Sequence, residues 1–206
     1  DNAYCLHEVY GEFVPFRDML TLCREAGNAD MVYEFASTSK ITFPGAGVAV
    51  MAASEANLKY LSGLLGAQTI SYDKVNQLRH VRFLQDKAHV LELMQRHAAI
   101  LRPKFEAVLA ALRGIAPLGI ASWTEPKGGY FISCDAMPGT AKRTLALCAG
   151  AGVTMTPAGA TYPGGNDPAD SNIRIAPSFP PVEELEQAMQ IFCLALRMAA
   201  LERLGL

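Results

Sequence analysis

The stretch Phe35-Ala36-Ser37-Thr38-Ser39-Lys40 decides the interpretation of this chain. It ends an apolar, β-prone run that starts at Met31, and a turn-forming segment, Pro44-Gly45-Ala46-Gly47, follows it. A lysine at the mouth of a buried strand is costly to desolvate unless it is paired. Burial makes an amine more nucleophilic by lowering its pKa, so the pattern favours a lysine that bonds to a carbonyl carbon.

The amino-acid composition is typical of a globular protein. The 206 residues suffice for one large domain or two small ones, and 50% of them are hydrophobic and 18% charged. A formal net charge of −2 gives no general case for nucleic acid as a partner. No uninterrupted apolar run reaches transmembrane length, so we expect no membrane association.

The thiols and imidazoles do not form metal-binding motifs. The number of cysteines is odd and no pair has C-x-x-C spacing; they are Cys5, Cys23, Cys134, Cys148 and Cys193. We therefore expect reduced thiols, a cytoplasmic location and no metal site. The four histidines, His7, His80, His89 and His97, form no H-x-x-x-H motif.

Periodicity predicts mixed α/β structure in the first part of the chain. We expect a helix over 16–26, a strand over 31–37 and a buried strand over 48–53. Ser54 is placed to cap a further helix that ends near Leu65, before Gly66.

A long helical stretch follows over 72–113, and Pro103 should kink it or begin a new helix. Beyond it the pattern predicts strands over 120–124, 130–134, 153–156 and 172–176, and helices over 141–149 and 181–204.

Four short motifs together resemble a known family. Ser37-x-Ser39-Lys40 is similar to the cofactor-lysine motif of fold-type I enzymes that depend on pyridoxal 5′-phosphate (PLP), and Asp1-x-x-Tyr4 to their pyridine-binding motif. Two further segments look like landmarks of class I aminotransferases: 126–131, Pro-Lys-Gly-Gly-Tyr-Phe, and 172–177, Asn-Ile-Arg-Ile-Ala-Pro. The sequence around Lys40 is most similar to that of the bacterial aspartate-aminotransferase-like subgroup, which is close to the MocR-type domain.

The resemblance implies an α/β fold and a division of the chain. Residues 1–90 would form the C-terminal part of the large PLP-binding domain with the start of the interdomain helix, and 91–206 the small α+β domain. Because fold-type I enzymes are about twice this length, we expect the chain to be the C-terminal half of such an enzyme.

The resemblance also implies roles for the residues of the first two motifs. Lys40 would hold the cofactor as a Schiff base and move a proton. Asp1 would pair with the pyridine nitrogen, and Tyr4 would donate to the ring oxygen. Ser37, with Ser39 as a weaker candidate, would donate to the phosphate.

One position departs from the family pattern. Many relatives have an arginine seven or eight residues after the lysine, where this chain has Gly47 and Val48. The backbone of 45–47 or a partner subunit would then grip the phosphate, and residues 68–74 would reach a neighbouring active site or else form an ordinary capping loop.

Substrate recognition is expected to depend on Arg174, which matches the family arginine that binds the α-carboxylate. Tyr162 lies in a Gly/Pro-rich segment that would face the substrate or would be a connector without a ligand role. Tyr130 or Phe131 would line the wall of the site.

The resemblance implies transamination between an amino acid, with aspartate favoured, and a 2-oxo acid, with 2-oxoglutarate favoured, in a homodimer with shared active sites. The alternatives are the PLP-binding effector domain of a MocR-type regulator, and a PLP lyase or decarboxylase. The motifs hold the cofactor in all three, so they do not settle the reaction type.

Overall fold

The computed structural model describes residues 1–11 and 13–206, which form two compact units. Of the described residues, 1–8 and 13–96 form the first unit, and 9–11 and 97–206 form the second. Helix α4 (Lys87–Ile115) contributes to both units. Within the described ranges, no helix has the length and apolar character needed to cross a membrane.

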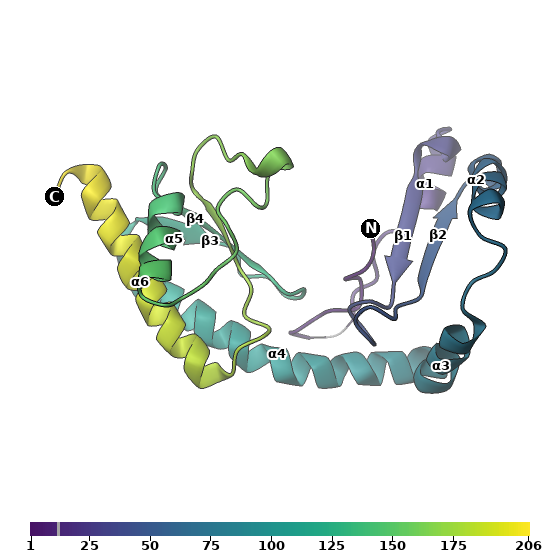
Figure 1. The fold of residues 1–206 in the computed structure, drawn as a ribbon, viewed down its shortest axis with the longest axis horizontal. Helices are drawn as coiled ribbons and strands as arrows, with labels where there is room; N and C mark the ends of the chain where they lie inside the picture. The colour runs from purple at the N-terminus through teal and green to yellow at the C-terminus, as the bar shows by residue number, and fades with distance from the viewer. Residues whose placement is uncertain (12) are drawn as a thin grey trace. The chain divides into compact units, whose positions relative to one another are not determined.

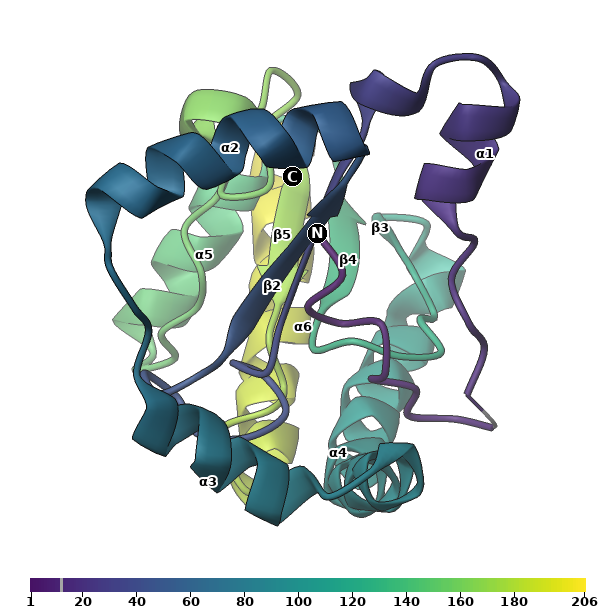
Figure 2. The same ribbon diagram turned by 90° about the vertical axis from the view of Figure 1, so that its right-hand side faces the viewer.

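The first unit is built on a two-stranded antiparallel sheet. Strand β1 (Tyr33–Ser37) pairs with β2 (Ala49–Ala53), with Phe35 opposite Met51, and both figures of the ribbon show the two strands side by side (Figures 1 and 2). The remaining elements of this unit are α1 (Met19–Glu25), a short 3₁₀ turn (Ala29–Met31), α2 (Glu55–Gln68) and α3 (Lys74–Leu84).

Side-chain oxygens set where these helices begin. Asp18 Oδ1 accepts a hydrogen bond from Thr21 N, so α1 starts at Met19 rather than at residue 16 as periodicity predicted. Ser54 caps α2 as expected, accepting from Asn57 N, but the helix continues through Gly66 to Gln68. One glycine weakens a helix without ending it.

The two strands of the first unit are not buried, which corrects an expectation. Phe35 is 49% exposed and Val50 59% exposed, although 31–37 and 48–53 read as buried strands. An apolar run signals a strand that can be buried, but burial needs elements on both sheet faces, and the described part of the chain does not cover this sheet.

The second unit is an α+β fold around a three-stranded antiparallel sheet of order β3-β4-β5. The strands are β3 (Ala121–Trp123), β4 (Ile132–Ala136) and β5 (Asn172–Ile175). Helices α5 (Ala141–Gly150) and α6 (Val182–Leu204) lie side by side (Figure 1), and two short 3₁₀ turns complete the unit, Ala116–Leu118 and Pro163–Gly165.

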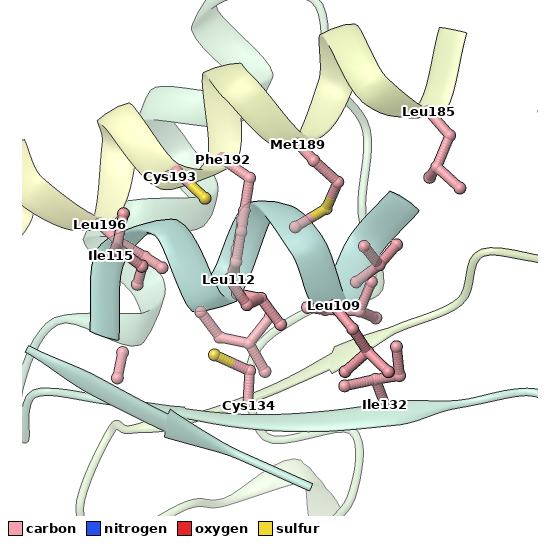
Figure 3. Close-up of a cluster of buried hydrophobic side chains, with 14 of the residues drawn as sticks. Leu109, Leu112, Ile115, Ile132, Cys134, Leu185, Met189, Phe192, Cys193 and Leu196 are labelled. Carbon is pink, nitrogen blue, oxygen red and sulfur yellow. The ribbon is translucent and has the colours of Figure 1, made fainter. Parts of the chain in front are cut away.

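A continuous hydrophobic core joins the sheet, α4 and α6 in this unit. Figure 3 shows α6 residues above α4 residues, with β4 residues below them. Phe105, Leu112 and Phe192 are fully buried, as is Ile132 on β4. Each such side chain contributes about 1.5–3 kcal/mol through its burial, so β5 extends from a well-packed support.

Two sequence predictions differ from the structure beyond α2. The long helix breaks at Gln85, which has φ of +55°, and Asp86 then accepts from His89 N; α4 runs through Pro103 without ending there. Residues 153–156 do not form a strand. Among the described residues, β5 is the edge strand of its sheet and pairs with β4, so 153–156 have no strand partner there.

Candidate active site

The loop over 38–48 joins β1 to β2 and carries Lys40. Thr38 closes its base, because Thr38 N donates to Val48 O (2.9 Å) and Val48 N donates to Thr38 Oγ1 (2.9 Å). Thr38 O accepts from the backbone N–H of both Ile41 and Thr42, each at 2.9 Å, so the chain winds tightly around Lys40. The backbone on both sides of the lysine is therefore fixed by hydrogen bonds.

The side chain of Lys40 is exposed in this chain, which corrects the expectation of a buried amine. It lies in the loop between the two strands of the β1–β2 sheet, which are themselves largely exposed. Its backbone is nevertheless anchored: His7 Nε2 lies 3.1 Å from Lys40 O, and because a carbonyl only accepts, Nε2 is the donor. His7 is buried, with 3% of its surface exposed.

The opening segment lies along β1, close to the lysine loop. Asn2 N donates to Phe35 O (2.6 Å), and the Asn2 side chain donates to the Glu34 carboxylate. Tyr4 is partly buried and packs edge-on against His7, with ring centroids 5.3 Å apart. The structure thus places Asp1-x-x-Tyr4 and Lys40 in one unit, although 33 positions separate His7 from Lys40.

Asp1 itself is exposed, and its Oδ1 accepts a hydrogen bond from Ala3 N (3.0 Å). This is the local turn contact that aspartate commonly makes in loops. The contact orients the carboxylate.

The two candidate phosphate hydroxyls are neighbours. Ser37 Oγ donates to Ser39 Oγ over 3.2 Å; Ser39 immediately precedes Lys40 and Ser37 lies three positions before it. Gly47 lies against the same serine: a Cβ at this position would be 2.7 Å from Ser39 Oγ and 3.2 Å from Ser39 N. The absence of a side chain at 47 therefore lets the two sides of the loop close on each other.

In the second unit, Arg174 lies on β5 with its guanidinium over the ring of Phe131, 4.6 Å from the centroid. Its Nε is buried and makes no hydrogen bond to the described residues. A guanidinium that stacks on a ring and keeps donors unused is prepared for a planar acceptor such as a carboxylate.

The segment that carries Tyr162 is tied to the strand that carries Arg174. Thr161 Oγ1 donates to Asn172 Oδ1 (2.7 Å), while Asn172 Nδ2 donates to Ser133 Oγ and to Asp135 Oδ1. Tyr162 is 38% exposed. The hydrogen bond of Thr161 fixes the loop at the residue before Tyr162.

Arg174 also borders a cavity of about 490 Å³ in the second unit. Most of its lining is apolar and comes from α6, β5 and 151–156. Among the described lining residues the charged ones are Arg174 and Glu184. The cavity thus offers a single cation, with no second one for another carboxylate.

Three contributors to this arrangement were missed by sequence reasoning: His7, Asn76 and His80. No sequence pattern indicates either histidine as a support of the lysine loop. Their partners lie about 30 to 40 positions away, as with His80 and Thr38, so no local spacing could reveal them.

Comparison with known proteins identifies the family. Residues 1–205 match the family described as aspartate amino-transferase. The chain belongs to the aspartate aminotransferase family. This family consists of fold-type I enzymes that depend on PLP, so the α/β fold expected from the four motifs is confirmed. The resemblance to the MocR-type domain gains no support from these matches.

Relatives of this aminotransferase-family chain are similar across nearly all of it. It is 46% identical over 203 residues to an aspartate aminotransferase of Corynebacterium glutamicum. A crystal structure of an aspartate transaminase from that organism superposes with a TM-score of 0.96 and 46% identity, covering 98% of this chain and 48% of the other. The chain thus spans about half the length of the curated relatives it matches.

A more distant structure shows the fold alone. It is LysN, an α-aminoadipate aminotransferase of Thermus thermophilus in complex with N-(5′-phosphopyridoxyl)-L-leucine, at 24% identity and a TM-score of 0.77. The match covers 96% of this chain and 49% of that one.

Proposed function

We propose that the protein containing this chain is a PLP-dependent aminotransferase in which Lys40 Nζ bonds to the cofactor aldehyde. The observation that carries the proposal is the convergence of the opening segment on the lysine loop, through the hydrogen bond of His7 Nε2 to Lys40 O. It brings a carboxylate, a phenol, two hydroxyls and an amine into one unit from two separate segments.

The residues present fit this cofactor by their chemistry. Ser37 and Ser39 offer adjacent hydroxyls for a phosphate, and the amine of Lys40 is exposed beside them. Asp1 offers a carboxylate for a protonated ring nitrogen, and Tyr4 a phenol for the ring oxygen. When bound, PLP supplies an aldehyde that holds the substrate amine and a ring that accepts electrons.

The roles of the protein groups follow from their atoms. Arg174 binds and orients the substrate α-carboxylate through two parallel N–H donors. With the cofactor bound, Lys40 Nζ would take the proton from the substrate α-carbon and deliver it to the former aldehyde carbon of the cofactor, which is general acid–base catalysis by a positioned amine. Asp1 keeps the ring nitrogen protonated by its negative charge.

The substrates follow from the relatives and from the cavity. Aspartate as donor is favoured by the name of the 46% identical relative, an aspartate aminotransferase. We propose 2-oxoglutarate as the acceptor, as the resemblance in sequence motifs implies. The cavity beside Arg174 presents no second cation among its described lining residues. We therefore propose that residues outside this cavity recognise the second carboxylate, and that Tyr162, which is 38% exposed, contacts the substrate.

We further propose a homodimer with shared sites and a cytoplasmic location. The segment 68–74 supports the first part, because it is exposed and holds apolar side chains, with Ile70 fully exposed and Tyr72 56% exposed. Such side chains favour contact with a neighbouring subunit over contact with water.

The test uses the protein from its complete gene. We expect a yellow protein whose imine absorbance disappears on borohydride reduction and is absent in the Lys40→Ala variant. Amino acids are then added singly, and loss of the band reports half-transamination. A colourless wild-type protein would overturn the proposal.

The same screen separates the related functions. Release of carbon dioxide or cleavage of a side chain would identify a decarboxylase or lyase. A coloured protein that converts no amino acid would identify a PLP-binding effector domain of the MocR type.

A further inference from the structure

Helix α3 supports the loop that carries Lys40. His80, one turn from the C-terminal end of this helix, is buried with 5% of its surface exposed. Its Nε2 lies 3.1 Å from Thr38 Oγ1 and 2.9 Å from Thr42 Oγ1. Thr38 and Thr42 are the residues two positions before and two positions after Lys40, so one imidazole contacts both flanks of the lysine.

The partners of His80 define its tautomer. Nδ1 lies 2.9 Å from Asn76 O, a carbonyl that can only accept, so Nδ1 carries the proton. In the neutral ring Nε2 is then an acceptor. Thr38 Oγ1 already accepts from Val48 N, which leaves its own proton free to donate to Nε2. Every polar atom of the imidazole therefore has a partner.

Asn76 supports the other side of the same loop. It lies one turn before His80 on α3, and its Nδ2 donates to Ala46 O (2.8 Å). The ring of His80 also packs edge-on against Phe43, with centroids 5.9 Å apart. The loop is thus held at 38, 42, 43 and 46 by two side chains on one helix face.

We propose that His80, assisted by Asn76, is a positioning residue that fixes the Thr38–Thr42 turn and so sets the direction in which Lys40 leaves the backbone. This inference rests on the proposed function, in which Lys40 holds the cofactor. A catalytic amine displaced by about 1 Å reacts far more slowly, so an immobile turn matters for the chemistry.

The experiment compares two replacements of His80 in the protein from its complete gene. His80→Gln retains an acceptor oxygen near the position of Nε2, whereas His80→Phe keeps a ring against Phe43 and removes both nitrogens. Arg82→Ala, at an exposed position on the same helix, is the control.

The first measurement is amide hydrogen exchange of the cofactor-free protein over 38–48. We expect exchange about tenfold faster in His80→Phe, near wild type in His80→Gln and unchanged in Arg82→Ala, with α6 unaffected in all three. Equal exchange in His80→Phe and wild type, or equal acceleration by Phe and Gln, would overturn the proposal.

The second measurement is PLP binding, followed by imine absorbance. We expect His80→Phe to form the imine about tenfold more slowly, with His80→Gln restoring most of the rate. If no variant and no wild-type protein forms an imine, the proposed function fails, while hydrogen exchange still decides the role of His80.

A second pair of variants covers the case in which His80→Phe does not fold. Thr42→Val keeps the side-chain shape and removes the hydroxyl that lies 2.9 Å from Nε2 and that also donates to Thr38 O (3.1 Å). Thr42→Ser keeps the hydroxyl and both contacts. Faster exchange over 38–48 in Thr42→Val alone supports the proposal, and identical exchange in the two overturns it. If both single variants fold, the double variant His80→Phe/Thr42→Val is measured as well. A change in exchange rate smaller than the sum of the two single changes, expressed as free energies, reports the coupling between His80 and Thr42.

Discussion

The stacking of Arg174 on Phe131 makes the guanidinium rigid before any substrate arrives. The ring lies 4.6 Å from the guanidinium carbon and restricts its rotation, and the strand below it belongs to the packed core. A preorganised fork loses little conformational freedom on binding a carboxylate. In the role proposed for Arg174, this rigidity would favour tight and oriented binding of the substrate carboxylate.

Replacement of Arg174 by lysine tests the fork directly. Lysine keeps the charge and loses the two parallel donors, so we expect substrate affinity to fall about 10- to 100-fold while PLP binding is unchanged. Titration of the imine absorbance with amino acid measures the first quantity and equilibrium binding of PLP the second. Phe131→Leu, which removes the stacking and leaves the guanidinium in place, should give a smaller loss. Normal affinity in Arg174→Lys would exclude Arg174 as the carboxylate ligand.

Three thiols in the second unit are protected by burial. Desolvation, helped by Asp135 and Cys193, raises the pKa of Cys134 to about 12, and desolvation raises that of Cys148 to about 11. Burial also raises the pKa of Cys193. Since the thiolate is the reactive form, these side chains are chemically inert in the folded unit.

Ellman's reagent at pH 8 checks this protection in the 206-residue chain. We expect fast modification of Cys5 and Cys23 at most, which are partly exposed, and reaction of all five thiols after unfolding. Fast reaction of three or more thiols in the folded chain would show that the core of the second unit opens readily.

At the scale of elements, the lysine loop depends on a glycine that has no space for a side chain. A Cβ at 47 would lie 2.7 Å from Ser39 Oγ, 3.2 Å from Ser39 N and 3.3 Å from Ser39 Cα. The last two atoms are backbone, so a rotation of the serine side chain cannot relieve the contact. The loop itself must move.

Gly47→Ala should therefore displace the lysine loop, and PLP affinity should fall about tenfold or more in spectroscopic titration. Gly63→Ala is the matched control. Gly63 lies inside α2 with nothing near its missing Cβ, and alanine there should stabilise the helix by about 0.5–1 kcal/mol. Equal PLP affinity in the two variants would mean that the loop tolerates a side chain at 47.

The loop that carries Tyr162 is closed by one buried carboxylate. Asp167 accepts from the backbone N–H groups of Asn172, Ser171 and Ala169, which hold its pKa below the ordinary value of 3.8. Ionisation of Asp167 thus stabilises the folded loop. Its contribution is complete above the ordinary pKa and is lost as the pH falls through the lowered one.

Acid should accordingly open this segment. We expect amide exchange over 156–171, corrected for its intrinsic pH dependence, to accelerate below about pH 4, and Asp167→Asn to show the acceleration already at pH 7. Exchange in α6 serves as the internal reference. Exchange over 156–171 that stays parallel to the reference down to pH 2 would argue against this role of Asp167.

Sequence patterns predicted elements better than their limits or their burial. The capping oxygen of Ser54 and the 172–176 strand were recognised because their signals are local. The helix break at Gln85–Asp86 was not, because Pro103 is the stronger local signal and a long helix can accommodate it. The support of the lysine loop by His80 depends on contacts across about 40 positions, which no spacing rule encodes.

At the scale of the whole molecule, the two units differ in how they bury apolar surface. The second unit encloses Phe105, Val108, Leu112 and Phe192 completely. The first leaves large apolar side chains in solvent, among them Met31, Val50, Tyr60, Leu64 and Tyr72. Conformational entropy opposes folding in both, so the unit with less burial is the less stable one.

Hydrogen exchange of the 206-residue chain should therefore divide at these units. We expect amides of α6 and β4 to be protected by several orders of magnitude more than those of β1, β2 and α2, because opening the first unit exposes little further apolar surface.

A dye that fluoresces on apolar surfaces should bind this chain, and should bind the protein from the complete gene more weakly if further segments cover the β1–β2 sheet. Equal protection in the two units would show that the first unit derives its stability from hydrogen bonds such as those of Thr38 and His80 rather than from burial.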